Sequence, residues 1–156
     1  MTRTKNIAKL LTLILVLCMV VIPFAGCKKK QNVNGYCTVV LETDPQTVYT
    51  VDLDKLGTVD NGLVSVFDYL KKAEKDFDYV EASPGYITKA GALEEDAAAG
   101  KYVYFWTSVE ADQSATPFNP SKEYNGTELI ESKVGVSGMT IQNGAIYYIA
   151  LITFSF

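Results

Sequence analysis

The sequence predicts an α+β fold in which a curved mixed sheet packs on one amphipathic helix, preceded by a cleaved signal peptide. One segment, residues 63–77, carries apolar residues at helical spacing. Short segments on both sides of it alternate between polar and apolar residues, as strands do. The first 26 residues have the composition of an export signal rather than of a folded element.

The signal segment ends in a cysteine. Three basic residues precede an apolar run over residues 10–24, and Ala25-Gly26-Cys27 follows the run. This arrangement resembles a bacterial lipoprotein signal peptide, which implies that the Cys27 thiol receives a diacylglyceryl group and becomes the new N-terminus. We therefore expect residues 1–26 to be removed. The protein is then expected outside the cytoplasm, anchored to the cell membrane through lipid on Cys27.

Two alternatives remain open for this segment. A transmembrane anchor needs about 20 apolar residues, and residues 10–27 come close, although Pro23 and Gly26 lie in the last turn. Simple secretion needs an A-x-A-like cleavage site, and none ends the run cleanly. In the lipoprotein interpretation, residues 27–35 form a lipidated tether. Its three lysines, residues 28–30, either attract anionic headgroups or belong to a solvated linker.

Charge and cysteine content narrow the classes of function. The chain has 14 basic and 18 acidic residues, and three of the basic ones lie in residues 1–26, which leaves a mature charge near −7. Nucleic acid is not an expected partner, because phosphate binding needs a basic surface. Cys37 has no partner cysteine within residues 36–156, so no disulfide is expected there. We expect it to be a small buried hydrophobe rather than a reactive thiol.

The domain is expected to begin with a hairpin. Residues 36–43 alternate between polar and apolar types, and residues 48–53 do so again. Asp44-Pro45 lies between them and is typical of a turn. The two segments therefore predict a pair of neighbouring antiparallel strands.

A single helix is expected to follow, because the apolar members of residues 63–77 share one face: Leu63, Val66, Phe67, Leu70, Ala73 and Phe77. Ser65 and Asp68 have the spacing of a capping box, which predicts that the helix starts near Ser65. Lysines gather in the later turns, where positive charge suits the helix dipole.

The second half of the domain is predicted to consist of strands and turns. In chain order these are a strand at 86–89, a connection with a helical turn at 94–100, a strand at 102–109, a long loop at 110–123, a turn at 124–127, a weak strand at 134–141, a hairpin turn at Asn143-Gly144 and a strand at 145–154. Residues 145–154 are apolar on both faces, which is typical of a central strand covered on both sides.

Several local patterns, taken in order, resemble the transcobalamin-like C-terminal domain family, a β-grasp module found in lipoproteins of Gram-positive bacteria. These patterns are NGLVSVFDYL at 61–70, GYITKAG at 85–91, FWTS at 105–108, YNG at 124–126 and NGAIYY at 143–148. The resemblance implies a β-grasp fold over residues 36–156. In vitamin B12 carriers this module closes one side of the cobalamin site, so cobalamin or another planar hydrophobic molecule is the ligand that the resemblance implies.

Aromatic residues are the strongest candidates for a binding site. Tyr102, Tyr104 and Trp106 share one face of a predicted strand, and Phe118 and Tyr124 flank the long loop beside it. Rings at a sheet surface can stack on a sugar, a corrin or a peptide. The alternative is that this face packs against the helix or another sheet, as aromatic residues in strands usually do.

Residues for catalysis or for binding a cofactor are sparse. The chain has no histidine, the commonest general base and metal ligand. Ser83 and Ser108 have no evident base, and no phosphate-binding glycine motif is present. Glu94, Glu95 and Asp96 suit either a hard cation or a solvated acidic surface, and we favour the latter. We therefore expect no metal and no cofactor, with cobalamin considered only as a ligand.

These observations predict a non-catalytic, lipid-anchored surface module that binds a small molecule or an envelope protein. One alternative is an interaction module that pairs an exposed edge strand with a partner. The other is a hydrolase of envelope polymers that uses carboxylates such as Glu128 and Glu131.

Overall fold

The computed structural model describes residues 31–154. The signal peptide, the lipid attachment at Cys27 and residues 27–30 of the tether lie outside this range, so these features remain predictions. Within the described range, no helix is long and apolar enough to cross a membrane.

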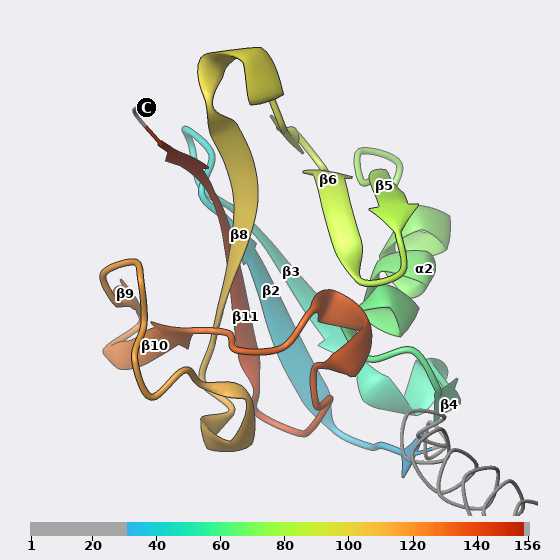
Figure 1. Cartoon of the computed structure of the whole chain (residues 1–156). Helices are drawn as coiled ribbons and strands as arrows, with labels where there is room; N and C mark the ends of the chain where they lie inside the picture. Colours follow the sequence, from blue (N-terminus) through green and yellow to red (C-terminus); the bar gives the residue numbers. More distant parts are fainter. Residues whose placement is uncertain (1–30, 155–156) are drawn as a thin grey trace, which may run out of the picture.

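The main sheet has six strands in the order β3-β2-β11-β8-β10-β9 (Figure 1). Their bounds are β2 Tyr36–Leu41, β3 Thr47–Asp52, β8 Lys101–Thr107, β9 Lys122–Tyr124, β10 Thr127–Glu131 and β11 Ile146–Thr153. β11 runs parallel to β2 and antiparallel to β8, so the sheet is mixed. The sheet curls, and one α-helix packs on it, which confirms the predicted fold class.

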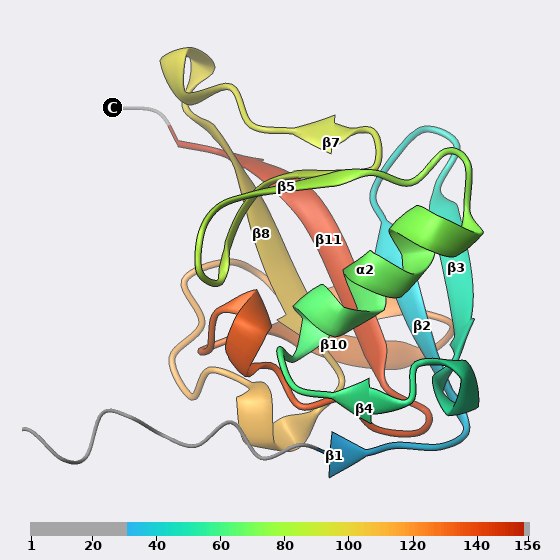
Figure 2. The same cartoon turned by 90° about the vertical axis from the view of Figure 1, so that its right-hand side faces the viewer.

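The helix α2, Leu63–Ala73, lies across one face of the main sheet (Figure 2). Its inward residues are Leu63, Val64, Val66, Phe67 and Leu70, each at most 2% exposed. Burying a large apolar side chain stabilises a fold by about 1.5–3 kcal/mol. The helix is therefore the main cover of this side of the sheet.

The predicted capping box is wrong. The helix begins at Leu63, two residues before Ser65, and its N-cap is Gly62, which has no side chain to cap it. The Ser65 hydroxyl instead accepts a hydrogen bond from the Asn61 backbone N–H at 3.2 Å. The helix also ends earlier than predicted, because Glu74 is extended, yet Phe77 still reaches the core and is 3% exposed.

A second, three-stranded sheet in the order β5-β6-β7 stands beside the first. It consists of β5 Tyr79–Ser83, β6 Tyr86–Ala90 and β7 Leu93–Glu94. The strand expected at 86–89 is confirmed as β6, whereas β5 was not predicted. Two further strands, β1 Gln31–Asn32 and β4 Thr58–Val59, pair with each other.

Four short 3-10 helices connect the described strands: η1 Leu53–Lys55, η2 Ala97–Ala99, η3 Glu110–Asp112 and η4 Val136–Gly138. The helical turn expected within 94–100 is confirmed as η2. The weak strand expected over 134–141 is wrong, because η4 occupies this segment. Asn143-Gly144 is a turn, but it closes no hairpin because the segment before it, residues 134–141, forms no strand. Its Asn143 Oδ1 accepts the Tyr36 N–H at 2.9 Å.

The main sheet has a hydrophobic core on each face. On the helix side, Val39, Val103, Tyr147 and Ile149 join the residues of α2. On the opposite side, a smaller core contains Val40, Trp106, Leu129, Tyr148 and Ala150. Since neighbouring residues of β11 enter different cores, this strand is buried on both faces, as predicted.

Cys37 is 1% exposed and lies in the helix-side core. Burial raises the pKa of its thiol to about 12. A thiol with such a pKa is neutral at physiological pH and a poor nucleophile. The expectation of a small buried hydrophobe is thus confirmed.

Alanine at Gly62 is expected to destabilise the fold more than alanine at Gly57. Both glycines have positive φ, 54° and 71°, so both substitutions strain the backbone. A Cβ at Gly62 would also lie 2.6 Å from the Val136 carbonyl oxygen, whereas one at Gly57 meets nothing within 4 Å. Urea unfolding of the full chain, followed by circular dichroism, should show an excess loss of about 1–3 kcal/mol for Gly62→Ala. Equal losses would contradict this packing.

Candidate ligand pocket between β8 and β6

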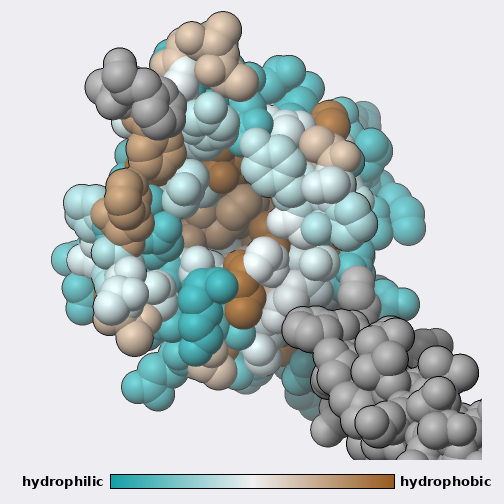
Figure 3. Space-filling model, viewed as in Figure 1, coloured by the Kyte–Doolittle hydropathy of each residue, from teal (hydrophilic) through white to brown (hydrophobic). Residues whose placement is uncertain are grey.

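A pocket of about 490 Å³ opens beside the first half of β8. Its lining residues come from both sheets, from the long loop and from the end of β11: Tyr86, Glu95, Tyr102, Val103, Tyr104, Phe118 and Phe154. Figure 3 shows apolar surface in a hollow near the middle of this face of the molecule. Five of the seven lining residues are aromatic. The other two are Val103 and the charged Glu95.

The pocket exists because the main sheet opens along one edge of β8. β10 pairs with β8 only at Trp106 and Thr107. After one more hydrogen bond, from the Ser132 N–H to the Phe105 carbonyl at 2.9 Å, the chain turns away. Residues 102–105 therefore have β11 as a strand partner on one side and no paired strand on the other. β6 lies across this opening without joining the sheet (Figure 1).

Three of the five predicted site residues line the pocket. Tyr102 and Tyr104 project from the same face of β8, and Phe118 comes from the loop, where it is 77% exposed. Trp106 shares the face of the two tyrosines, as predicted, but is fully buried. Tyr124, in β9, packs against the same small core and does not line the pocket. The aromatic face of β8 is thus divided into two tyrosines that line the pocket and one tryptophan in the core.

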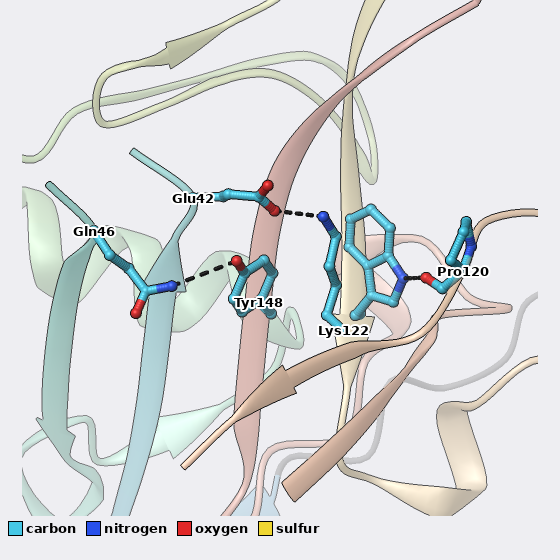
Figure 4. A network of polar contacts seen from close by, with 6 residues as sticks. Glu42, Gln46, Pro120, Lys122 and Tyr148 are labelled. Atoms are coloured by element: carbon cyan, nitrogen blue, oxygen red, sulfur yellow. Dashed lines mark hydrogen bonds and ion pairs between the residues drawn. The ribbon is translucent and has the colours of Figure 1, made fainter. Parts of the chain in front are cut away.

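Trp106 is buried in the small core to which Leu129 of β10 and Tyr124 of β9 contribute. Figure 4 shows Lys122 beside this core, with its ammonium directed toward Glu42. Its indole N–H donates to the Pro120 carbonyl at 2.9 Å. The Lys122 ammonium lies 5.3 Å from the centre of the Trp106 ring and 5.7 Å from that of Tyr148. The same ammonium forms an ion pair with Glu42 at 2.6 Å. Trp106 is therefore a structural residue, and its ring lies 6.4 Å from that of Tyr104, which lines the pocket.

Glu131 holds the loop that carries Phe118. Its carboxylate accepts hydrogen bonds from the backbone N–H groups of Phe118 and Asn119 at 2.6 and 2.8 Å, and from the Asn119 side chain at 3.2 Å. Glu131 is 9% exposed, whereas Glu128 is exposed and lies on the other face of β10. These two carboxylates lie on opposite faces of β10, so the alternative of an acid–base pair made by them has no structural support.

Sequence reasoning did not place Tyr86, Glu95 or Phe154 in the aromatic site, and considered Glu95 only as part of the acidic run at 94–96. The Tyr86 hydroxyl lies 2.8 Å from both carboxylate oxygens of Glu95 and donates to them. This hydrogen bond, followed by burial, raises the pKa of Tyr86 to about 12, so the phenol stays neutral at physiological pH. The GYITKAG pattern contained Tyr86, but nothing in it indicated that the side chain would face β8.

Phe154 lies at the centre of the ring cluster. Its ring centroid is 5.8 Å from those of Tyr102, Tyr104 and Phe118. Its backbone N–H donates to the Gly100 carbonyl at 2.9 Å, which ties it to the chain just before β8. These tilted contacts are typical of aromatic packing. Phe154 therefore contacts both the tyrosines of β8 and Phe118 of the long loop.

The acidic run Glu94, Glu95 and Asp96 does not converge on one point. Glu95 accepts from Tyr86, and the Asp96 side chain accepts from the Ala99 N–H at 3.1 Å, which caps η2. In residues 31–154, no three cysteine or carboxylate side chains come together as a metal site would require. The geometry gives the hard-cation alternative no support.

Removal of Glu131 is expected to loosen the pocket loop, whereas removal of Glu128 is not. Glu131→Ala leaves buried N–H groups without an acceptor, and should lower the free energy of unfolding by about 2–4 kcal/mol. Glu128→Ala should change it by less than about 0.5 kcal/mol. Urea unfolding of both variants tests this difference. Similar effects in the two variants would show that Glu131 does not hold the loop.

Comparisons with known proteins agree with the fold. No protein-family model matches the chain, and no curated protein is similar to it in sequence. Among solved structures, haptocorrin in complex with Cbi is similar, with a TM-score of 0.51 and 16% identity, over 80% of this chain and 26% of haptocorrin. A protein from Ruminococcus gnavus that has been proposed to bind metal has a TM-score of 0.49 and 13% identity, over 78% of this chain and 100% of that one. At this identity, the likeness to haptocorrin shows a shared fold.

Proposed function

We propose that this chain is a non-catalytic binding module whose aromatic pocket receives an apolar part of a small-molecule ligand. The carrying observation is the pocket itself, about 490 Å³ in volume and lined by five aromatic side chains. Ligand sites commonly have volumes of about 300–1,000 Å³ and apolar walls with a few polar groups. Glu95 with the Tyr86 hydroxyl provides such a polar group at the wall.

Cobalamin is the first ligand to test. The motif resemblance to the transcobalamin-like family and the shared fold with haptocorrin, which was solved with Cbi, both favour it. This chain spans about a quarter of the haptocorrin chain, so it would supply only one wall of a comparable site. Fold similarity alone is a weak argument for function, and the aromatic pocket is what makes the proposal specific.

Two observations favour binding over catalysis. The chain contains no histidine. Glu131, which was one half of the suggested acid–base pair, uses its carboxylate to hold the 118–119 backbone. A general acid or base must be free to reach the reacting atom, and Glu131 is buried in a structural role.

Tyr104→Ala is expected to weaken ligand binding at least about tenfold, because it removes a ring from the pocket wall. The full chain, purified in detergent, is titrated calorimetrically with cobalamins and with a panel of planar aromatic molecules. Tyr36→Ala is the matched control, since Tyr36 is 57% exposed and lies outside the pocket. Absence of any Tyr104-dependent binding across the panel would overturn the proposal.

Edge-strand pairing is a second candidate function, favoured by residues 102–104 of β8, which pair with β11 on one side and with no strand on the other. An extended peptide would bind there through its main chain. Binding of that kind should survive Tyr104→Ala, because main-chain hydrogen bonds do not need the ring. The same variant therefore separates the two functions.

We also propose that the module is held at the outer side of the cell membrane by lipid on Cys27. The support is the sequence pattern that ends at this residue. A diacylglyceryl group supplies two acyl chains, which suffice for stable anchoring where one does not.

Mass spectrometry of the chain from its native host should find an N-terminus at Cys27 that carries a diacylglyceryl group. Cys27→Ser should block this processing and leave residues 1–26 attached. Cys18→Ser is the control, because Cys18 lies inside the segment that is removed. An unmodified Cys27 in the unaltered chain would refute the anchor.

A further inference from the structure

We propose that the pocket between β8 and β6 selects an organic cation with alkylated nitrogen, such as a trimethylammonium group. The positive charge would lie against the aromatic rings and beside Glu95. This inference rests on the proposed function, since it names the chemical class of ligand for the same pocket.

The aromatic walls suit such a cation. The ring centroids of Tyr102, Tyr104 and Phe118 each lie 5.8 Å from that of Phe154, and Tyr86 lines the same pocket from the other sheet. The face of an aromatic ring carries partial negative charge and attracts a cation within about 6 Å. A trimethylammonium group combines an apolar surface with a positive charge, so it can replace water at several rings at once.

Charge in the pocket has one sign. Glu95 is the only charged residue among the seven that line it, and none of them is basic. Both of its oxygens accept from the Tyr86 hydroxyl at 2.8 Å, which fixes the carboxylate at the wall. A carboxylate in this position favours a cation and opposes an anion.

The charge of the whole domain acts in the same direction. Residues 31–154 contain 18 acidic and 8 basic residues. A surface potential of this sign raises the local concentration of cations and lowers that of anions. An anionic planar ligand is therefore disfavoured both in the pocket and on the way to it.

Inorganic cations and simple ammonium groups fit less well. Calcium takes six to eight oxygen ligands, and Glu95 is the only carboxylate that lines this pocket. A primary ammonium is strongly hydrated, and apolar walls would strip its water without replacing the hydrogen bonds. An alkylated nitrogen has few or no N–H groups, so it loses fewer hydrogen bonds to water when it enters the pocket. We therefore infer an alkylated ammonium rather than a primary one.

The test compares choline with 3,3-dimethylbutanol, its neutral isostere in which carbon replaces the charged nitrogen. The full chain in a maltoside detergent is titrated with each, and dissociation constants are measured by NMR. We expect choline to bind about three- to thirtyfold more tightly, the range that cation–π contacts supply. Glu95→Gln should reduce this preference about two- to fivefold. Glu94→Gln should leave it unchanged, since Glu94 does not line the pocket.

Glycerophosphocholine is titrated in parallel, because the same cation occurs free and as a lipid headgroup. Tighter binding of glycerophosphocholine than of choline, with both weakened in Glu95→Gln, identifies the lipid headgroup as the ligand. Tighter binding of choline than of glycerophosphocholine identifies a free, soluble cation as the ligand.

Equal binding of choline and its isostere would overturn the cation inference while leaving the proposed apolar pocket in place. A choline preference that Glu95→Gln does not alter would also overturn it. Failure of all these ligands, together with failure of the cobalamin and aromatic panel, would overturn both the inference and the proposed function.

Discussion

Burial of β11 on both faces is the constraint on which the rest of this structure depends. The strand lies between β2 and β8, and its alternate residues enter two separate cores. Tyr147 and Ile149 face the helix, whereas Tyr148 and Ala150 face the β9–β10 hairpin. An apolar strand of this kind cannot be exposed on either side without a large cost. Two covering layers are therefore required, and the pocket is formed where they leave part of β8 uncovered.

The uncovered part results from a mismatch of strand lengths. β8 has seven residues and pairs with β11 along its whole length, whereas β10 pairs with only two of them. Lys122 and Pro120 hold the hairpin over Trp106, and Glu131 holds the loop that bears Phe118. The aromatic face of β8 is consequently a structural core at one end and a pocket wall at the other. A concave, mostly apolar wall with few polar groups is typical of small-molecule binding sites.

The chemistry of the pocket is more specific than its shape. Rings from both sheets meet a single carboxylate, and no basic side chain lines the wall. This combination separates ligands by the sign of their charge. The shared fold with haptocorrin does not by itself make that distinction, because the side chains at the pocket are those of this chain.

Sequence alone determined the features that depend on local periodicity. These include the helix α2, the hairpin of β2 and β3, the central position of β11 and the burial of Cys37. Alternation and helical spacing record which face of each element is apolar. The segment at 134–141 and the role of Trp106 were decided by contacts between segments far apart in the chain. The capping box was wrong for a local reason, because the Ser65 hydroxyl accepts the Asn61 N–H. Tyr86, Glu95 and Phe154 meet Tyr104 only because two sheets and the end of β11 converge. Tertiary packing sets such a meeting, and spacing along the chain does not encode it.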